Sequence, residues 1–215
     1  MPVTTATMGE ITLTCDIARV EERIVFTYSL TNQGRGAVVV LAAATAADAA
    51  TGRRRVDEGA VATWLGEDRQ AHVLKGTAPM PATADPEAPI LPLGVRLEPG
   101  ARLERRHAEM LPLAEHSPYV PLGNLREYRM APIQGMALTV EVLPALPGLV
   151  AEARELGRGW WRPVDLEAAA GLALRLTCAF RARGLFMLAR RDDYPRPALP
   201  KAPVAGVGAP EGSAV

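Results

Sequence analysis

The sequence predicts an all-β protein, an antiparallel β-sandwich with long Pro-rich loops and at most one or two short helices. Apolar and polar residues alternate with a period of two in several segments, which is the pattern of half-buried strands. Turn residues separate these segments, and helical material is too sparse for β-α-β units. With 215 residues, 48% of them hydrophobic, the chain is long enough to bury a core without disulfides.

The clearest strands lie near the start of the chain. Residues 11–17 place Ile, Leu, Cys and Ile on one face, and residues 24–30 place Ile, Phe, Tyr and Leu on one face. The polar residues 21–23 separate the two segments. We therefore expect an antiparallel hairpin over residues 10–31. Shorter strands are expected at 38–41, 60–65 and 71–74.

Prolines and charges divide the middle of the chain. Residues 79–92 contain five prolines and are expected to form a loop, because proline donates no hydrogen bond to a sheet. A strand ending at Leu97 leads into a turn, and residues 101–113 follow as a long strand. Its many charges are typical of a sheet edge, where they discourage aggregation. A second loop is expected at 112–132.

The last third of the chain is predicted to add two more core strands. Residues 136–142 and 172–180 both alternate cleanly. Residues 149–156 could form a short helix that ends at Gly157, and a helical turn is expected at 165–170. Residues 185–190 follow a turn. We predict a single domain over 8–192 and a disordered Pro/Ala/Gly-rich tail over 193–215.

Composition limits the classes of function. Lys and Arg together number 24, as do Asp and Glu, so the formal net charge is zero. This balance argues against a nucleic-acid partner held by phosphate neutralisation. The start of the chain lacks a signal peptide, and no apolar run is long enough to span a membrane. With only two cysteines, a cytoplasmic location is expected.

Two segments resemble parts of small bacterial immunoglobulin-like domains. One is the alternating strand Phe26-Thr27-Tyr28-Ser29-Leu30-Thr31-Asn32, and the other is the turn and strand entry Leu97-Glu98-Pro99-Gly100-Ala101-Arg102-Leu103. Similar elements occur in the intracellular proteinase-inhibitor-like domains of bacteria and in accessory modules. The resemblance implies an immunoglobulin-like sandwich and a binding rather than catalytic role. It carries over no inhibitory activity, because no reactive loop can be matched.

The two cysteines leave two interpretations open. Cys15 and Cys178 both fall on the inward faces of predicted strands. Immunoglobulin-like sandwiches often join an early and a late strand by a disulfide. Two buried free thiols, which behave as small apolar side chains, are the expected alternative in a reducing compartment.

The sequence predicts no catalytic, cofactor-binding or metal site. The histidines are His72, His107 and His116, without the spacing of a metal or protease motif. His107 and Glu109 would share a face of the predicted edge strand. A metal-binding protein or hydrolase that uses His107, His116 and the neighbouring glutamates Glu104, Glu109 and Glu115 is therefore an alternative function. A solvated edge strand accounts for the same residues.

The most unusual local feature is Trp160-Trp161, which stands between arginines. Tryptophan and arginine are enriched where proteins bind one another. We expect a partner-binding patch of Trp160, Trp161, Arg158 and Arg162, which Tyr119 would extend; packing of one tryptophan against the core is the competing interpretation. The main hypothesis is a non-enzymatic binding or scaffolding module that recognises another protein. A structural subunit of a larger assembly is a further alternative.

Overall fold

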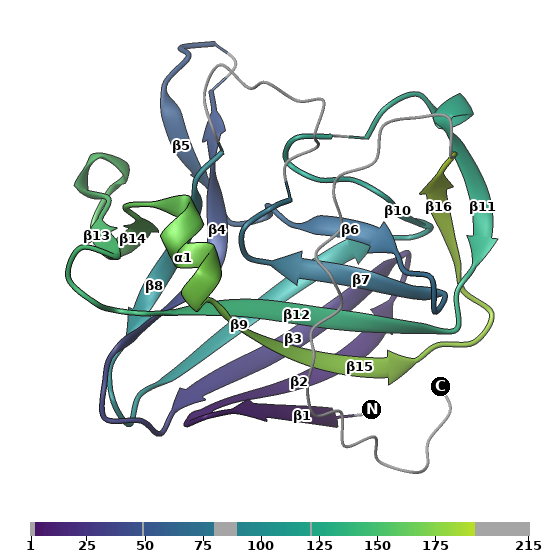
Figure 1. The fold of residues 1–215 in the computed structure, drawn as a ribbon. Coiled ribbons are helices and arrows are strands. Elements are labelled where there is room, and N and C mark those ends of the chain that lie inside the picture. The colour runs from purple at the N-terminus through teal and green to yellow at the C-terminus, as the bar shows by residue number, and fades with distance from the viewer. Residues whose placement is uncertain (1–2, 49, 80–89, 121, 192–215) are drawn as a thin grey trace.

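The computed structural model describes residues 3–48, 50–79, 90–120 and 122–191, and it confirms an all-β fold (Figure 1). Four strands form the first sheet in the order β1-β2-β3-β9. They are β1 (Val3–Met8), β2 (Ile11–Val20), β3 (Arg23–Asn32) and β9 (Arg102–Met110). The predicted hairpin is β2–β3, which pairs without interruption from Ile11↔Asn32 to Val20↔Arg23. As expected, the charged strand β9 lies at an edge of this sheet.

The second sheet is larger and branched. Its main path has the order β13-β14-β8-β4-β12-β7-β6. The strands are β13 (Val150–Glu152), β14 (Trp160–Pro163), β8 (Pro92–Leu97), β4 (Val38–Ala47), β12 (Gly135–Pro144), β7 (Gln70–Lys75) and β6 (Ala62–Leu65). β15 (Leu174–Arg181) pairs with β12, and β5 (Arg54–Asp57) pairs with β4. Most pairs are antiparallel, but β7 runs parallel to β12.

The main core lies between these two sheets. Alternating residues of β2 and β3 are buried against side chains of β7, β12 and β15. Phe26 and Leu138 are fully buried, and the Phe26 and Phe180 rings lie 6.4 Å apart between centroids. The period of two in the sequence therefore identified the inward faces of β2 and β3 correctly, since the alternating apolar residues from Ile11 to Cys15 and from Ile24 to Leu30 belong to this core.

A small third sheet joins the loop regions of the second half of the chain. It contains β10 (Leu113–Ala114), β16 (Phe186–Arg190) and β11 (Tyr128–Pro132), in that order. The expectation of a continuous loop over 112–132 is therefore wrong, since β10, the 3-10 helix η1 (Leu125–Glu127) and β11 all lie within it. The strands were hidden because each is short and pairs with β16, which is distant in sequence.

Residues 149–172 contain the helical material, but not where the first helix was expected. Residues 149–156 form β13 and a 3-10 helix, η2 (Arg154–Leu156), because β13 pairs with β14 and this pairing overrides helix propensity. The helical turn expected at 165–170 is confirmed as α1 (Leu166–Leu172). The Asp165 side chain caps it by accepting hydrogen bonds from the backbone N–H groups of Glu167 and Ala168.

Two further expectations concern segments that the structure describes only in part or not at all. Most of the predicted Pro-rich loop at 79–92 and the tail at 193–215 lie outside them, although Pro92 itself begins β8. Within the part of the chain that the structure covers, no helix is both long and apolar enough to cross a membrane.

Candidate functional site

Both tryptophans of the expected patch belong to β14 and are half-buried. Trp160 packs against a cluster of Ala43, Leu93 and Ala153, and Trp161 packs against a neighbouring apolar cluster that includes Leu41. A large part of each indole is therefore buried by packing against the core. The remaining exposed part of each indole faces the surface at this end of the molecule.

The arginines beside the tryptophans remain accessible. Arg158 is exposed in a turn between Gly157 and Gly159, whose positive φ angles of 107° and 85° favour glycine. Arg162 pairs with Glu155 at 2.8 Å between Nη1 and Oε1. The guanidinium of Arg96 lies 5.1 Å from the centre of a Trp161 ring, within the range of a cation–π contact.

Tyr119 lies on another segment. Its hydroxyl accepts a hydrogen bond from the Ile90 N–H and donates one to the Ile90 carbonyl, so it holds the chain just before β8. Among the described residues no hydrogen bond or ring contact joins Tyr119 to Trp160 or Trp161.

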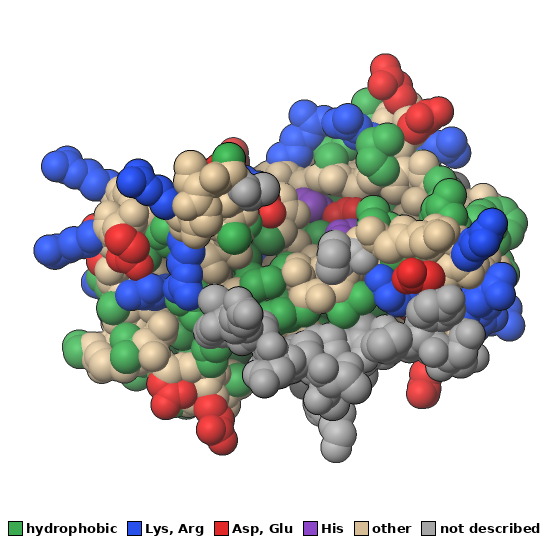
Figure 2. Space-filling model, turned by 90° about the horizontal axis from the view of Figure 1, so that it is seen from above, with side chains coloured by type: hydrophobic (Ala, Val, Ile, Leu, Met, Phe, Trp, Pro, Cys, Tyr) green, Lys and Arg blue, Asp and Glu red, His purple; other side chains and the backbone are tan. Residues whose placement is uncertain are grey.

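The structure brings β5 (Arg54–Asp57), a strand that begins with arginine, to the apolar cluster on which Trp160 packs. Val56 of β5, Leu156 of η2 and Trp160 of β14 pack in one apolar cluster. Arg54 shares a strand face with Val56, and Arg53 precedes it. We define the arginine surface as Arg53, Arg54, Arg154, Arg158 and Arg162. Figure 2 shows basic side chains projecting at this end of the molecule, on the left of the view.

A second candidate site lies inside the protein, where β9 faces the core. Alternate residues of β9 point inward, and two of them are His107 and Glu109. Nε2 of His107 lies 2.6 Å from Oε1 of Glu109, and both side chains are largely buried. The imidazole stacks on Phe26 with ring centroids 6.5 Å apart. The His/Glu pair that the alternation of β9 indicated is therefore formed.

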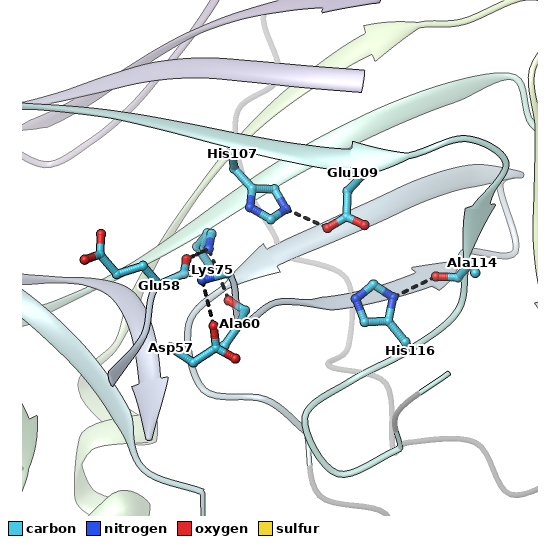
Figure 3. Close-up of polar contacts among 9 residues, drawn as sticks. Asp57, Glu58, Ala60, Lys75, His107, Glu109, Ala114 and His116 are labelled. Atoms are coloured by element: carbon cyan, nitrogen blue, oxygen red, sulfur yellow. Dashed lines mark hydrogen bonds and ion pairs between the residues drawn. The ribbon is translucent and has the colours of Figure 1, made fainter. Parts of the chain in front are cut away.

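Lys75 approaches the same region from the opposite sheet. It is the last residue of β7 and is 2% exposed. Its Nζ donates hydrogen bonds to the backbone carbonyls of Glu58, at 2.6 Å, and Ala60, at 3.2 Å. Figure 3 shows the Lys75 and His107 side chains pointing into the same space, with Glu109 beside them.

Burial lowers the pKa values of both Lys75 and His107. Desolvation lowers the pKa of Lys75 to about 8, although the charges of Glu109, Asp57 and Glu58 oppose the shift. Desolvation also lowers the pKa of His107, although its hydrogen bond to Glu109 opposes the shift. A neutral His107 must donate its Nε2 proton to the carboxylate, because the carboxylate can only accept. Nδ1 is then left with a free lone pair.

The other residues of the histidine hypothesis do not join this pair. Glu115 accepts hydrogen bonds from the backbone N–H groups of Leu65 and Arg190, so its carboxylate links β6 to β16. Glu104 is exposed and pairs with Arg102. His116 donates from Nδ1 to the Ala114 carbonyl. Over residues 3–48, 50–79, 90–120 and 122–191, no group of three His, Cys, Asp or Glu side chains could hold a metal ion.

The cysteines are buried free thiols in this structure. Sγ of Cys178 lies 3.5 Å from the Thr4 carbonyl and 3.8 Å from the Leu13 carbonyl. Burial raises the pKa of both thiols, and the neighbouring Cys178 raises that of Cys15 further. Buried thiols with raised pKa values are poor nucleophiles, so neither cysteine is a candidate reactive group.

Reasoning from the sequence missed Lys75 and the arginines in and directly before β5. A signal existed for each. Lys75 is one of only two lysines and ends an apolar segment, and Arg53-Arg54-Arg55 is a run of three like charges. Comparisons with known proteins return no match to a family model, to a curated protein or to a solved structure.

Proposed function

We propose that this chain is a non-enzymatic binding module that uses its arginine surface to recognise an acidic segment of a partner protein. The observation that carries this proposal is that Val56, Leu156 and Trp160 pack against one apolar cluster, so that β5, η2 and β14, each of which contains an arginine, come together. An immunoglobulin-like sandwich is the proposed fold type. The cytoplasm is the proposed compartment, since two free thiols persist there most readily.

The charge of the surface favours an anionic partner. Its five arginines stand beside two carboxylates, Glu152 and Glu155, which pair with Arg154 and Arg162. Among the described residues, no hydrogen-bond or ion-pair partner is found for the guanidinium groups of Arg53, Arg54 or Arg158. Guanidinium groups with free donors bind carboxylates in a two-pronged geometry, so they are suited to Asp and Glu side chains.

The part of the arginine surface around β14 is supported by paired strands. β14 pairs with both β13 and β8, and the two indoles pack on apolar clusters beneath it. Because these strands are held before a partner arrives, little ordering of the surface is needed on binding. The exposed parts of the tryptophans supply apolar contact next to the charges.

An acidic polypeptide fits better than a nucleic acid. The two carboxylates within the surface would repel a continuous phosphate backbone, and the chain as a whole has zero formal net charge. A peptide can place its own carboxylates between Glu152 and Glu155, where they meet the arginines. This argument commits the proposal to a protein partner.

Binding of a fluorescein-labelled octaglutamate peptide, followed by fluorescence anisotropy, tests the proposal. We expect Arg54→Glu with Arg158→Glu to weaken binding at least tenfold, and added salt to weaken binding to the unaltered protein. The matched control is Arg102→Glu with Arg106→Glu, which makes the same charge change on exposed residues of β9.

Three outcomes would overturn this proposal. The peptide does not bind the unaltered protein, the control weakens binding as much as the test variant, or a ten-residue oligothymidine binds as tightly and is lost in the same variant. The last result would point to a nucleic-acid partner instead.

A further inference from the structure

A buried amine, a paired imidazole and two carbonyl acceptors meet inside the protein, away from the arginine surface. Lys75 has the same orientation on β7 as Ala71 and Val73, which belong to the main core. A charged lysine is costly at such a position unless it is paired. Among the described residues, no carboxylate lies within 4.0 Å of its Nζ, since none of their ion pairs includes Lys75.

The hydrogen bonds of Lys75 suit a neutral amine. An ammonium group has three protons to donate, and the two carbonyls of Glu58 and Ala60 accept two of them. A neutral amine has two protons and one lone pair. With both protons donated to these carbonyls, the lone pair is left free and faces away from them, as required of a nucleophile.

His107 points into the same space as the Lys75 amine, where it can transfer a proton. Its Nε2 proton is held by Glu109 at 2.6 Å, which leaves Nδ1 as the basic nitrogen. A carboxylate that fixes the tautomer of an imidazole in this way is a common arrangement around general bases. Figure 2 shows a hollow on one face of the molecule, with histidine and carboxylate side chains at its floor.

We propose that Lys75 is a carbonyl-reactive lysine that condenses with a small aldehyde, with His107 carrying the protons. The lone pair of Nζ attacks the carbonyl carbon and forms a C–N bond, while the C=O electrons move to oxygen. His107 Nδ1 transfers the first amine proton to that oxygen, which gives a carbinolamine. Loss of the second amine proton and of the C–O bond releases water and leaves an imine. No oxidant or reductant takes part.

An aldehyde is favoured over a bulkier carbonyl compound because the site is confined. Lys75 and His107 are both buried, so a reacting carbon needs an unhindered path to Nζ. The charged groups that face Lys75 come from three elements: Glu109 on β9, Asp57 at the end of β5, and Glu58 in the following turn. These carboxylates disfavour an anionic aldehyde, which leaves a neutral one.

Reductive trapping with propionaldehyde and sodium cyanoborohydride on the full chain tests the proposal. The chain has only two lysines, so peptide mapping by mass spectrometry compares Lys75 directly with Lys201. An amine with a pKa of about 8 is half neutral at pH 8, whereas an ordinary lysine with a pKa of 10.5 is ~0.3% neutral. We expect Lys75 to be modified at least tenfold faster than Lys201 in the native protein, with no preference in urea.

Two histidine variants distinguish proton transfer by His107 from an effect of burial alone on the reactivity of Lys75. His107→Gln should slow the modification of Lys75 at least tenfold and change its pH profile. His72→Gln is the matched control, because His72 lies on the opposite face of the same strand as Lys75 and should leave the rate unchanged. Slower modification of Lys75 in the native protein than in urea would identify it as a structural lysine and overturn the proposal. Equal effects of the two variants would remove the role of His107.

Discussion

Nε2 of His107 lies 2.6 Å from Oε1 of Glu109, and the two residues stand two positions apart on the inward face of an edge strand. The same strand shows Arg102, Glu104 and Arg106 to solvent on its other face. Charges on both faces are typical of a protected edge strand, but the inward positions of a β-rich core are ordinarily apolar, so this pair is a buried polar contact. The pair therefore has consequences for stability that can be measured.

Stability should depend on pH through His107. Desolvation lowers its folded pKa below the unfolded value of about 6.5, so the unfolded state binds the proton first as the pH falls. The contribution of neutral His107 is complete above that value and is lost at lower pH. We expect the stability advantage of the unaltered protein over His107→Gln to be smaller at pH 5 than at pH 7 in urea unfolding. An advantage that grows at pH 5 would contradict this.

Lys75 should produce a second pH dependence at alkaline pH. Its folded pKa of about 8 is below its ordinary value of 10.5, so stability is greatest above pH 10.5 and falls as the pH decreases to 8. The difference in unfolding free energy between the unaltered protein and Lys75→Met should therefore change by about 3 kcal/mol over that range. Urea unfolding at pH 8, 9 and 10 measures it. A constant difference would show that Lys75 is charged at pH 9 in the folded state.

Removing the Glu115 carboxylate should destabilise the protein. It accepts backbone hydrogen bonds from Leu65 at 2.8 Å and from Arg190 at 2.5 Å, and it is 7% exposed. Glu115→Ala leaves two donors without these acceptors, at a cost of about 2–4 kcal/mol in unfolding free energy. Glu104→Ala, at an exposed position of β9, is the control and should change stability by less than ~0.5 kcal/mol. Equal stability of the two variants would mean that water replaces the carboxylate at low cost.

Gly94 should not tolerate a side chain. A Cβ atom there would collide with the side chain of Val39 and lie 2.7 Å from the Val40 carbonyl oxygen, because β8 and β4 approach closely at this point. Gly94→Ala should lower the melting temperature by several degrees, at a cost of about 1–3 kcal/mol. Gly36→Ala is the matched control, since a Cβ there meets nothing within 4 Å. Because β14 pairs with Gly94, the variant should also weaken octaglutamate binding.

The two thiols should react only after unfolding. Cys15 and Cys178 are buried, and burial raises the pKa of each thiol. We expect slow reaction with Ellman's reagent in the native protein and rapid reaction of two thiols per chain in urea. Release of no thiol in urea before reduction would instead show the disulfide interpretation to be right.

Features that depend on neighbouring residues could be predicted from the sequence of this protein, whereas features that depend on contacts between distant segments could not. Alternation over residues 10–31 predicted the hairpin, because which side of a strand is apolar is a local property and the turn at 21–23 is short. The same local logic placed His107 and Glu109 on one face of β9. It also placed α1, whose capping Asp165 stands directly before it.

Strand pairing across long sequence separations was not decided locally. The alternation of β7 and of β12 says nothing about their parallel pairing, and β11 and β13 are too short to reveal themselves without their partners. Pairing with β14 turned residues 150–152 into a strand, although their neighbours favour a helix. The expected loop at 112–132 failed for the same reason.

The sequence by itself thus determined the all-β class, the inward faces of the main strands and the edge position of β9, because each follows from the polarity of neighbouring residues. Only the tertiary structure decided that Lys75 ends beside His107 and that Val56 of β5 packs on the same cluster as Trp160. These residues come from segments far apart in the chain. The lowered pKa of Lys75 has the same origin, since desolvation by other strands exists only once the sheets have packed.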